Sequence, residues 1–151
     1  MLTTKEINSL IVTAKIARDK AFSFKSGHSF GAAVLTSDNE IYGGCNSEGV
    51  ISSLGVCAEM SAIDHAVVHG NYDFKAICVV DDNITYPCGA CLQYLTQFSQ
   101  VNDCDFEIIA SDMNSNFEIK KLSELLPKQF KSKSFDTKIK LFHKKDATKN
   151  K

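Results

Sequence analysis

The chain has 151 residues, a formal net charge of −1 and 44% hydrophobic residues, which excludes collagen-like, low-complexity and wholly disordered proteins. The length fits one domain, and the near-neutral charge gives no general attraction for nucleic acids or membranes. The N-terminus lacks a signal-peptide pattern and no apolar run reaches the roughly 18–20 residues of a membrane span, so we expect a cytoplasmic protein whose six cysteines are reduced.

The N-terminal part of the chain predicts a helix followed by a hairpin. Apolar residues at helical spacing indicate a helix over residues 3–21, and Thr3 with Glu6 fits a capping box at its start. Two β-like runs follow at residues 31–36 and 40–45. The polar turn between them predicts an antiparallel pair.

The middle of the chain alternates helices with buried strands. A helix is predicted over residues 57–69, and the continuous apolar run at 75–81 predicts a strand buried on both faces. The remaining predicted elements are a helix that begins at Pro87, strands at 105–110 and 117–119, and a short helix at 122–126. This order predicts an α/β sandwich, in which helices cover both faces of the sheet.

Charge is distributed unevenly along the chain. Residues 1–130 carry nine basic and sixteen acidic side chains, whereas residues 131–151 carry eight lysines and two aspartates. We therefore expect a main domain over 1–130 and a Lys-rich C-terminal extension over 131–151, with a strand at 139–142. The extension is either a solvated tail or a segment that lies on an acidic neighbouring subunit.

Two short motifs, each at the predicted start of a helix, indicate a metal site. The first is Cys57-Ala58-Glu59, and the second is Pro87-Cys88-Gly89-Ala90-Cys91. Cys88 and Cys91 lie three positions apart, so both can bind one metal ion, and Cys57 supplies a third sulfur. Zinc favours such ligands, and three protein ligands leave a fourth position open, as in catalytic zinc sites. Helix N-termini also lower the pKa of thiols.

Glu59 stands two positions after Cys57, and residues two apart on a helix do not face each other. The two can act together only if the metal lies beyond the N-terminus of the helix, where Glu59 could take up and deliver a proton. The Cys-x-x-Cys pair alone also fits a redox pair or a closed structural zinc site. Such a site would need a fourth sulfur from Cys45, Cys78 or Cys104, although the apolar run around Cys78 favours a core thiol.

With these motifs the chain resembles the zinc-dependent cytidine deaminases, in their small single-domain form. The sequence signature of the wider superfamily pairs a ligand-x-Glu motif, in which the ligand is His or Cys, with a later Pro-Cys-x-x-Cys motif. Further stretches resemble the family in the same order along the chain: Gly31-Ala32-Ala33, then Gly44-Cys45-Asn46-Ser47-Glu48, then Glu124-Leu125-Leu126-Pro127 with Phe130. The resemblance implies a three-layer α/β/α sandwich with a mixed sheet of about five strands.

The resemblance also implies roles for individual residues. Cys57, Cys88 and Cys91 would hold one Zn²⁺ per subunit, and Glu59 would be the proton shuttle. Asn46 and Glu48 would bind the ribose 3′-hydroxyl, the Ala58 carbonyl would accept from the exocyclic amine, and Phe130 would reach the base in a neighbouring subunit. The family implies a homotetramer that takes a small nucleoside rather than a nucleic acid polymer.

Four positions depart from the family pattern. Met60 and Leu92 stand where relatives carry a basic residue and an arginine, and Ser52 replaces a tyrosine found in some of them. Because three thiolates and Zn²⁺ sum to −1, we expect either a less electrophilic zinc or a compensating cation from elsewhere. His28 aligns with the phenylalanine that stacks near the base, and a histidine there could stack or donate a hydrogen bond.

The function implied by the resemblance is hydrolytic deamination of cytidine and 2′-deoxycytidine, for pyrimidine salvage. Two alternatives remain open at this point. One is a deaminase of another aminopyrimidine nucleoside such as blasticidin S, and the other is a zinc-binding module without catalysis. Asn46 and Glu48 favour a nucleoside substrate, and Glu59 argues against a purely structural site.

Overall fold

The computed structural model describes residues 1–101 and 103–149, with side chains as far as Leu141. Five strands form one mixed sheet in the order β2-β1-β3-β4-β5. The strands are β1 (Gly31–Thr36), β2 (Ile41–Cys45), β3 (Phe74–Val80), β4 (Glu107–Ser111) and β5 (Phe117–Lys121). Only β3 and β4 run parallel among these five, and the other neighbours are antiparallel. The predicted hairpin is confirmed as the β1–β2 pair.

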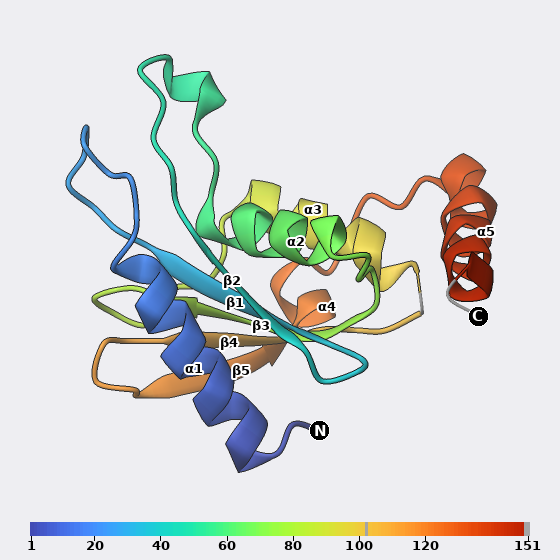
Figure 1. Cartoon of the computed structure of the whole chain (residues 1–151), viewed down its shortest axis with the longest axis horizontal. Coiled ribbons are helices and arrows are strands. Elements are labelled where there is room, and N and C mark those ends of the chain that lie inside the picture. Colours follow the sequence, from blue (N-terminus) through green and yellow to red (C-terminus); the bar gives the residue numbers. More distant parts are fainter. Residues whose placement is uncertain (102, 150–151) are drawn as a thin grey trace.

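Helices cover both faces of the sheet (Figure 1). Helix α1 (Thr4–Arg18) lies on one face, and α2 (Ala58–Val68) and α3 (Gly89–Ser99) lie on the other. Alternate residues of β1 serve the two cores, because successive side chains of a strand point to opposite faces: Ala33 and Leu35 pack on the α1 side, and Ala32 and Val34 pack on the α2 side. The predicted α/β/α sandwich with a mixed sheet is therefore confirmed.

The first helix begins as its sequence predicts. The Thr3 side chain accepts a hydrogen bond from the Glu6 backbone N–H, and the Glu6 carboxylate accepts from the Thr3 N–H at 2.7 Å. This reciprocal capping box satisfies two of the free N–H groups at the helix start. None of the described helices has the length and apolar character required to cross a membrane.

One edge of the sheet gathers several chain segments at a single place. Gly31, at the start of β1, pairs with Cys45 at the end of β2 and with Val80 at the end of β3. The segments that enter β1 and leave β2 and β3 therefore meet there. Ligands in open α/β sheets bind outside the carboxyl ends of strands at such points. The loop after β2 forms a projecting arm that carries the short 3₁₀ helix η1 (Ser52–Leu54) and leads to α2 (Figure 1).

Close packing of α2 on β2 sets where α2 begins. A Cβ atom on Gly44 would lie 2.2 Å from the Ala62 nitrogen and 2.7 Å from the Ala58 carbonyl oxygen. Real Cβ atoms do not approach backbone this closely, so only glycine allows the helix to lie so near the strand. This contact brings the N-terminus of α2 to the edge of the sheet described above.

The C-terminal residues contain two helices, α4 (Leu122–Leu125) and α5 (Lys133–Lys149). The strand predicted at 139–142 is wrong, because these residues lie within α5. Phe135 and Ile139 follow the i, i+4 spacing of a helix instead. Helix α5 contacts the main domain through Lys140, whose Nζ lies 3.2 Å from Asp103 Oδ1.

Candidate active site

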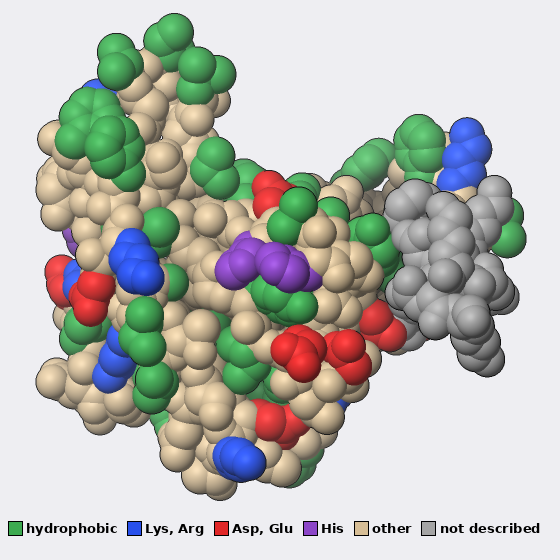
Figure 2. Space-filling model, viewed as in Figure 1, with side chains coloured by type: hydrophobic (Ala, Val, Ile, Leu, Met, Phe, Trp, Pro, Cys, Tyr) green, Lys and Arg blue, Asp and Glu red, His purple; other side chains and the backbone are tan. Residues whose placement is uncertain are grey.

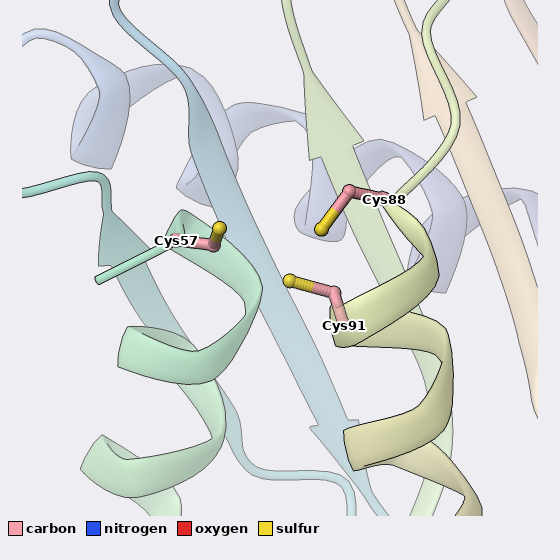
Figure 3. Close-up of side chains that lie close together, drawn as sticks. All are labelled: Cys57, Cys88 and Cys91. Carbon is pink, nitrogen blue, oxygen red and sulfur yellow. The ribbon is translucent and has the colours of Figure 1, made fainter. Parts of the chain in front are cut away.

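Three cysteines come together where α2 and α3 begin. Cys57 is the N-cap residue of α2, Cys88 is the N-cap residue of α3, and Cys91 lies in the first turn of α3. Their Sγ atoms all lie within 4.8 Å of one another. Figure 3 shows the sulfur atoms turned toward a common point between the two helices. The metal therefore lies beyond the helix N-termini if these thiols bind one, as the spacing of Cys57 and Glu59 requires.

The donor set fits a zinc ion held by three protein ligands. Neither N-cap cysteine uses its side chain to cap its helix, so both sulfurs are available. Among the described residues no fourth cysteine joins the cluster. Cys78 is buried in β3, where burial raises the pKa of its thiol to about 12, so it is a core thiol as predicted. A three-sulfur set with an open position is the arrangement of catalytic zinc sites.

The protein alone does not favour ionised thiols at this cluster. Burial raises the pKa of Cys91, and the negative charges of Glu59 and Cys57 raise it further. Burial likewise raises the pKa of Cys57. Among the described residues, no lysine, arginine or histidine hydrogen-bonds to the three sulfurs. Stabilisation of three thiolates must therefore come from a bound cation and from the positive ends of α2 and α3. The described side chains do not include the compensating cation considered above.

Glu59 lies in the first turn of α2, directly beside the cysteine cluster. Its residue surface is only 6% exposed. Burial raises the pKa of Glu59, and its own backbone N–H and the Cys91 thiol partly counter that effect. A buried carboxyl whose pKa moves toward neutrality can both accept and donate a proton. The position and environment of Glu59 therefore suit the proton shuttle predicted from the motif.

A cavity of about 540 Å³ opens beside this cluster. Its volume is in the range of sites for small organic ligands. Six of the nine residues assigned from the sequence line it: Asn46, Glu48, Cys57, Ala58, Glu59 and Cys88. The structure thus brings the predicted metal ligands, shuttle and sugar-binding residues to one cavity, with the buried Cys91 behind them.

Asn46 and Glu48 both hold the loop that borders the cavity. Asn46 Oδ1 accepts from the Phe30 N–H at 2.8 Å, and Asn46 Nδ2 donates to the His28 carbonyl at 3.0 Å. The Glu48 carboxylate accepts from the backbone N–H groups of Lys25 and Ser26 and from the Ser26 hydroxyl. The Ser26 hydroxyl in particular lowers the pKa of Glu48. In this chain the two residues therefore have a structural role as well as a place in the cavity.

Two predicted substrate residues do not line the cavity. His28 lies behind the wall, where its Nε2 is 2.8 Å from Asp81 Oδ1. Phe130 is 73% exposed, and its carbonyl accepts from Gln93 Nε2 at 2.8 Å. A role for Phe130 at a neighbouring subunit's site stays a prediction. Of the departures from the family pattern, Leu92 packs in the core at 7% exposure, and Ser52 lines the cavity.

Sequence reasoning missed several residues of the cavity wall. Phe30, Val79, Thr85 and Tyr86 all line it. Thr85 and Tyr86 immediately precede Pro87, so proximity to the second motif was a usable signal for them. Phe30 had no comparable signal, because its place depends on the meeting of β1 with β2 and β3.

The chain is similar to known proteins in sequence and in structure. The family model for the cytidine and deoxycytidylate deaminase zinc-binding region matches residues 4–107. A cytidine deaminase of Sporosarcina psychrophila is 35% identical over 127 residues, which are 83% of this chain and 91% of that protein. A blasticidin-S deaminase of Bacillus cereus is 30% identical over 113 residues, 68% of this chain and 77% of that protein. The crystal structure of cytidine deaminase from Burkholderia pseudomallei matches with a TM-score of 0.75 at 32% identity, over 85% of this chain and 100% of that chain.

Proposed function

The chain belongs to the cytidine and deoxycytidylate deaminase family, and from this premise we propose that it is a zinc-dependent enzyme that deaminates cytidine and 2′-deoxycytidine. The products are the uridine nucleosides and ammonia, and we place the reaction in pyrimidine salvage in the cytoplasm. One observation carries the proposal: the buried Glu59 carboxyl lies beside three converging cysteine thiols, and Glu59, Cys57 and Cys88 line one cavity in the size range of small-ligand sites.

Cys57, Cys88 and Cys91 would hold one zinc ion per chain. When bound, zinc supplies Lewis-acid activation of the attacking water at neutral pH. Glu59 would accept a proton from that water and pass it to N3 of the base, and would then move the proton of the new C4 hydroxyl to the leaving amine. Its burial is useful for both steps, because a raised pKa lets the same carboxyl act as base and then as acid.

Substrate orientation would come from groups on the cavity wall. The Ala58 carbonyl stands between Cys57 and Glu59 and would accept a hydrogen bond from the exocyclic amine. Asn46 and Glu48 carry oxygens that can accept from the sugar 3′-hydroxyl. Because both side chains already hold the loop over residues 25–30, sugar binding and loop position would be coupled.

Ammonia release from cytidine, 2′-deoxycytidine, cytosine and blasticidin S tests the proposal. We expect release from the two nucleosides, loss of release after treatment with a strong chelator and its return with Zn²⁺. Metal analysis should give about one zinc per chain. If the folded, zinc-loaded protein releases ammonia from none of the four compounds, the alternative of a zinc-binding module without catalysis replaces the proposal.

Blasticidin S is the second candidate substrate. The similarity to a blasticidin-S deaminase supports it. The position of His28 supports it too, because the residue that aligns with the family's base-stacking phenylalanine does not line the cavity. A larger value of kcat/KM for blasticidin S than for cytidine in the same assay would favour blasticidin S as the substrate. We keep cytidine as the first candidate because Asn46 and Glu48 both line the cavity.

We further propose that copies of the chain associate, with a homotetramer expected from the resemblance and a dimer as the alternative. Figure 2 shows hydrophobic side chains gathered over the projecting arm and the neighbouring loop. The exposed apolar residues of this region are Phe22, Phe24, Val50, Ile51 and Leu54. Patches of this kind mark interaction sites. Light scattering should give an oligomer that Leu54→Asp dissociates and that the control Val12→Asp, on α1, leaves intact.

We propose a catalytic domain over residues 1–130 with an appended extension over 131–151. All residues of the cavity and of the cysteine cluster lie before Phe130. The hydrogen bonds between Gln93 and the Phe130 backbone would survive removal of the extension. A chain that ends at Phe130 should therefore bind zinc and release ammonia at the rate of the full chain, and its oligomeric state tests whether the extension lies on a neighbouring subunit.

A further inference from the structure

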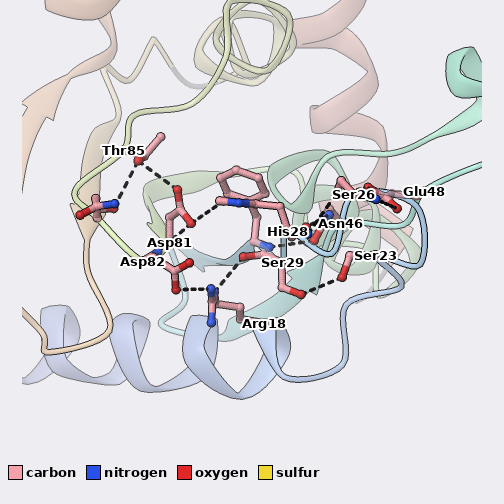
Figure 4. Close-up of polar contacts among 12 residues, drawn as sticks. Arg18, Ser23, Ser26, His28, Ser29, Asn46, Glu48, Asp81, Asp82 and Thr85 are labelled. Carbon is pink, nitrogen blue, oxygen red and sulfur yellow. Dashed lines mark hydrogen bonds and ion pairs between the residues drawn. The ribbon is translucent and has the colours of Figure 1, made fainter.

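Residues 28–30 form a short segment, the strap, that leads into β1 and is held by three different parts of the fold (Figure 4). The His28 imidazole lies 2.8 Å from Asp81, at the end of β3. The Ser29 carbonyl accepts from Arg18 Nε at 2.8 Å, and the Phe30 N–H donates to Asn46 Oδ1 at 2.8 Å. Each residue of the strap thus has its own anchor.

Asp81 is the central anchor of this network. The residue is only 5% exposed, and a buried carboxylate is costly unless donors surround it. One carboxylate oxygen contacts His28 and accepts from the Asp82 backbone N–H at 2.7 Å. The other accepts from the Thr85 hydroxyl at 3.1 Å. Asp81 therefore connects the strap with the loop that leads to Cys88.

The network around Asp81 reaches the substrate cavity through two residues that line it. Phe30 and Thr85 both line the cavity, whereas His28 and Asp81 do not. The His28 ring packs on the Phe30 ring, with a centroid distance of 4.6 Å. One buried carboxylate thus holds Thr85 directly and Phe30 through the His28 ring.

We propose that His28 is a positioning residue that fixes the aromatic wall of the substrate cavity. It contacts Asp81 on one side and the Phe30 ring on the other, and so sets how tightly the cavity holds an aminopyrimidine nucleoside. The proposal rests on the deaminase function proposed above. It also replaces the sequence-based expectation that His28 itself touches the base.

A second metal site is the competing explanation of the same residues. One ligand atom each of His28, Asp81 and Asp82 lie within 4.8 Å of one another. The Arg18 guanidinium, however, lies 2.6 Å from Asp82 Oδ1 and supplies the positive charge that a metal would bring. We therefore assign the group to an ion-paired support of the strap rather than to a metal.

Two substitutions separate the two contacts of His28. His28→Gln keeps a side-chain N–H for Asp81 but removes the ring, whereas His28→Phe keeps a ring against Phe30 but removes the hydrogen bond. His28→Ala removes both contacts. The matched control is His69→Ala, an exposed histidine on the end of α2 that contacts neither the strap nor the cavity. Because His28 is partly exposed, all three variants should fold.

Steady-state kinetics with cytidine give the first readout. We expect His28→Ala to raise KM about ten-fold, the size of one lost hydrogen bond to a charged partner, with kcat within about two-fold. His28→Gln and His28→Phe should each give a smaller rise, and His69→Ala none. An unchanged KM in His28→Ala overturns the proposal, as does a zinc content that falls in step with activity, which would indicate a metal role.

Backbone hydrogen exchange at residues 28–30 gives a second readout that needs no turnover. We expect faster exchange in His28→Ala than in the wild type or in His69→Ala. Exchange rates that do not change overturn the positioning role even if the protein deaminates cytidine. Conversely, if the wild type deaminates no tested nucleoside while exchange rises in His28→Ala, the deaminase function fails and the support of the strap stands.

Discussion

The substitution Glu59→Gln tests the proposed proton shuttle while leaving the three proposed metal ligands in place. Glutamine has nearly the shape of glutamate, and Glu59 is 6% exposed, so packing at the start of α2 should persist. Among the described residues that line the cavity, the other carboxylate is Glu48, which is held by the loop at Lys25 and Ser26. Among the described cavity residues, no second carboxylate is therefore free to move the proton. General acid–base catalysis contributes about 10²–10⁴-fold. We expect the upper part of that range, a fall in kcat of about 10³–10⁴-fold or about 4–5.5 kcal/mol.

Three measurements on Glu59→Gln check this reasoning. Ammonia release at saturating cytidine gives kcat, metal analysis gives the zinc content, and thermal unfolding gives Tm. We expect about one zinc per chain and a Tm no lower than that of the wild type, because burial disfavours the charged form of Glu59. Glu40→Gln, on the exposed turn between β1 and β2, is the control and should behave as the wild type. A fall in kcat of less than ten-fold in the zinc-loaded variant would refute the assignment of Glu59 as the shuttle.

Three further predictions concern the cluster, its support and the loop. Cys91→Ser should reduce bound zinc to well below one per chain by metal analysis, whereas Cys45→Ser, outside the cluster, should keep it. Gly44→Ala should lower both Tm and zinc content because its Cβ would meet Ala62 at 2.2 Å, while Gly89→Ala, which meets nothing within 4 Å, should be tolerated; equal Tm values would contradict this. The Ser26 hydroxyl lowers the pKa of Glu48. The contacts of the Glu48 carboxylate with the loop should therefore be fully present above the ordinary glutamate pKa and should be lost as the pH falls through the lowered pKa. Amide exchange near Ser26 that is no faster in Glu48→Gln than in the wild type at neutral pH would contradict that view.

The cysteine cluster could be predicted because its motifs are local in sequence. Cys88 and Cys91 share one helical turn, and Cys57 and Glu59 share another, so only the meeting of two helix starts depended on the tertiary fold. The strands could be predicted for a similar reason, since alternating or continuous apolar runs record burial directly. The main error of this kind is α5, where a four-residue stretch with three apolar side chains (139–142) resembled a strand.

The cavity wall could not be predicted because it is assembled from distant segments. Phe30 reaches the cavity only because β1 pairs with both β2 and β3, which also brings Asn46 and Asp81 to its two sides. The alignment with a stacking phenylalanine pointed to His28 instead. In the structure the aromatic residue two positions later lines the cavity, and His28 supports it from behind.

The only arginine of the chain, Arg18, lies beside the strap and not beside the cysteine cluster. The resemblance leads one to expect an arginine beside the second motif, but Leu92 stands there and packs in the core. Arg18 instead lies at the strap, where it donates to the Ser29 carbonyl and pairs with Asp82. Among the described residues no side-chain cation hydrogen-bonds to the cysteine cluster, whereas Arg18 holds the segment that leads to Phe30 on the cavity wall. Zinc affinity in this chain should accordingly be insensitive to Arg18→Gln, whereas KM for the nucleoside should rise, and a loss of zinc from that variant would show that the two regions are not independent.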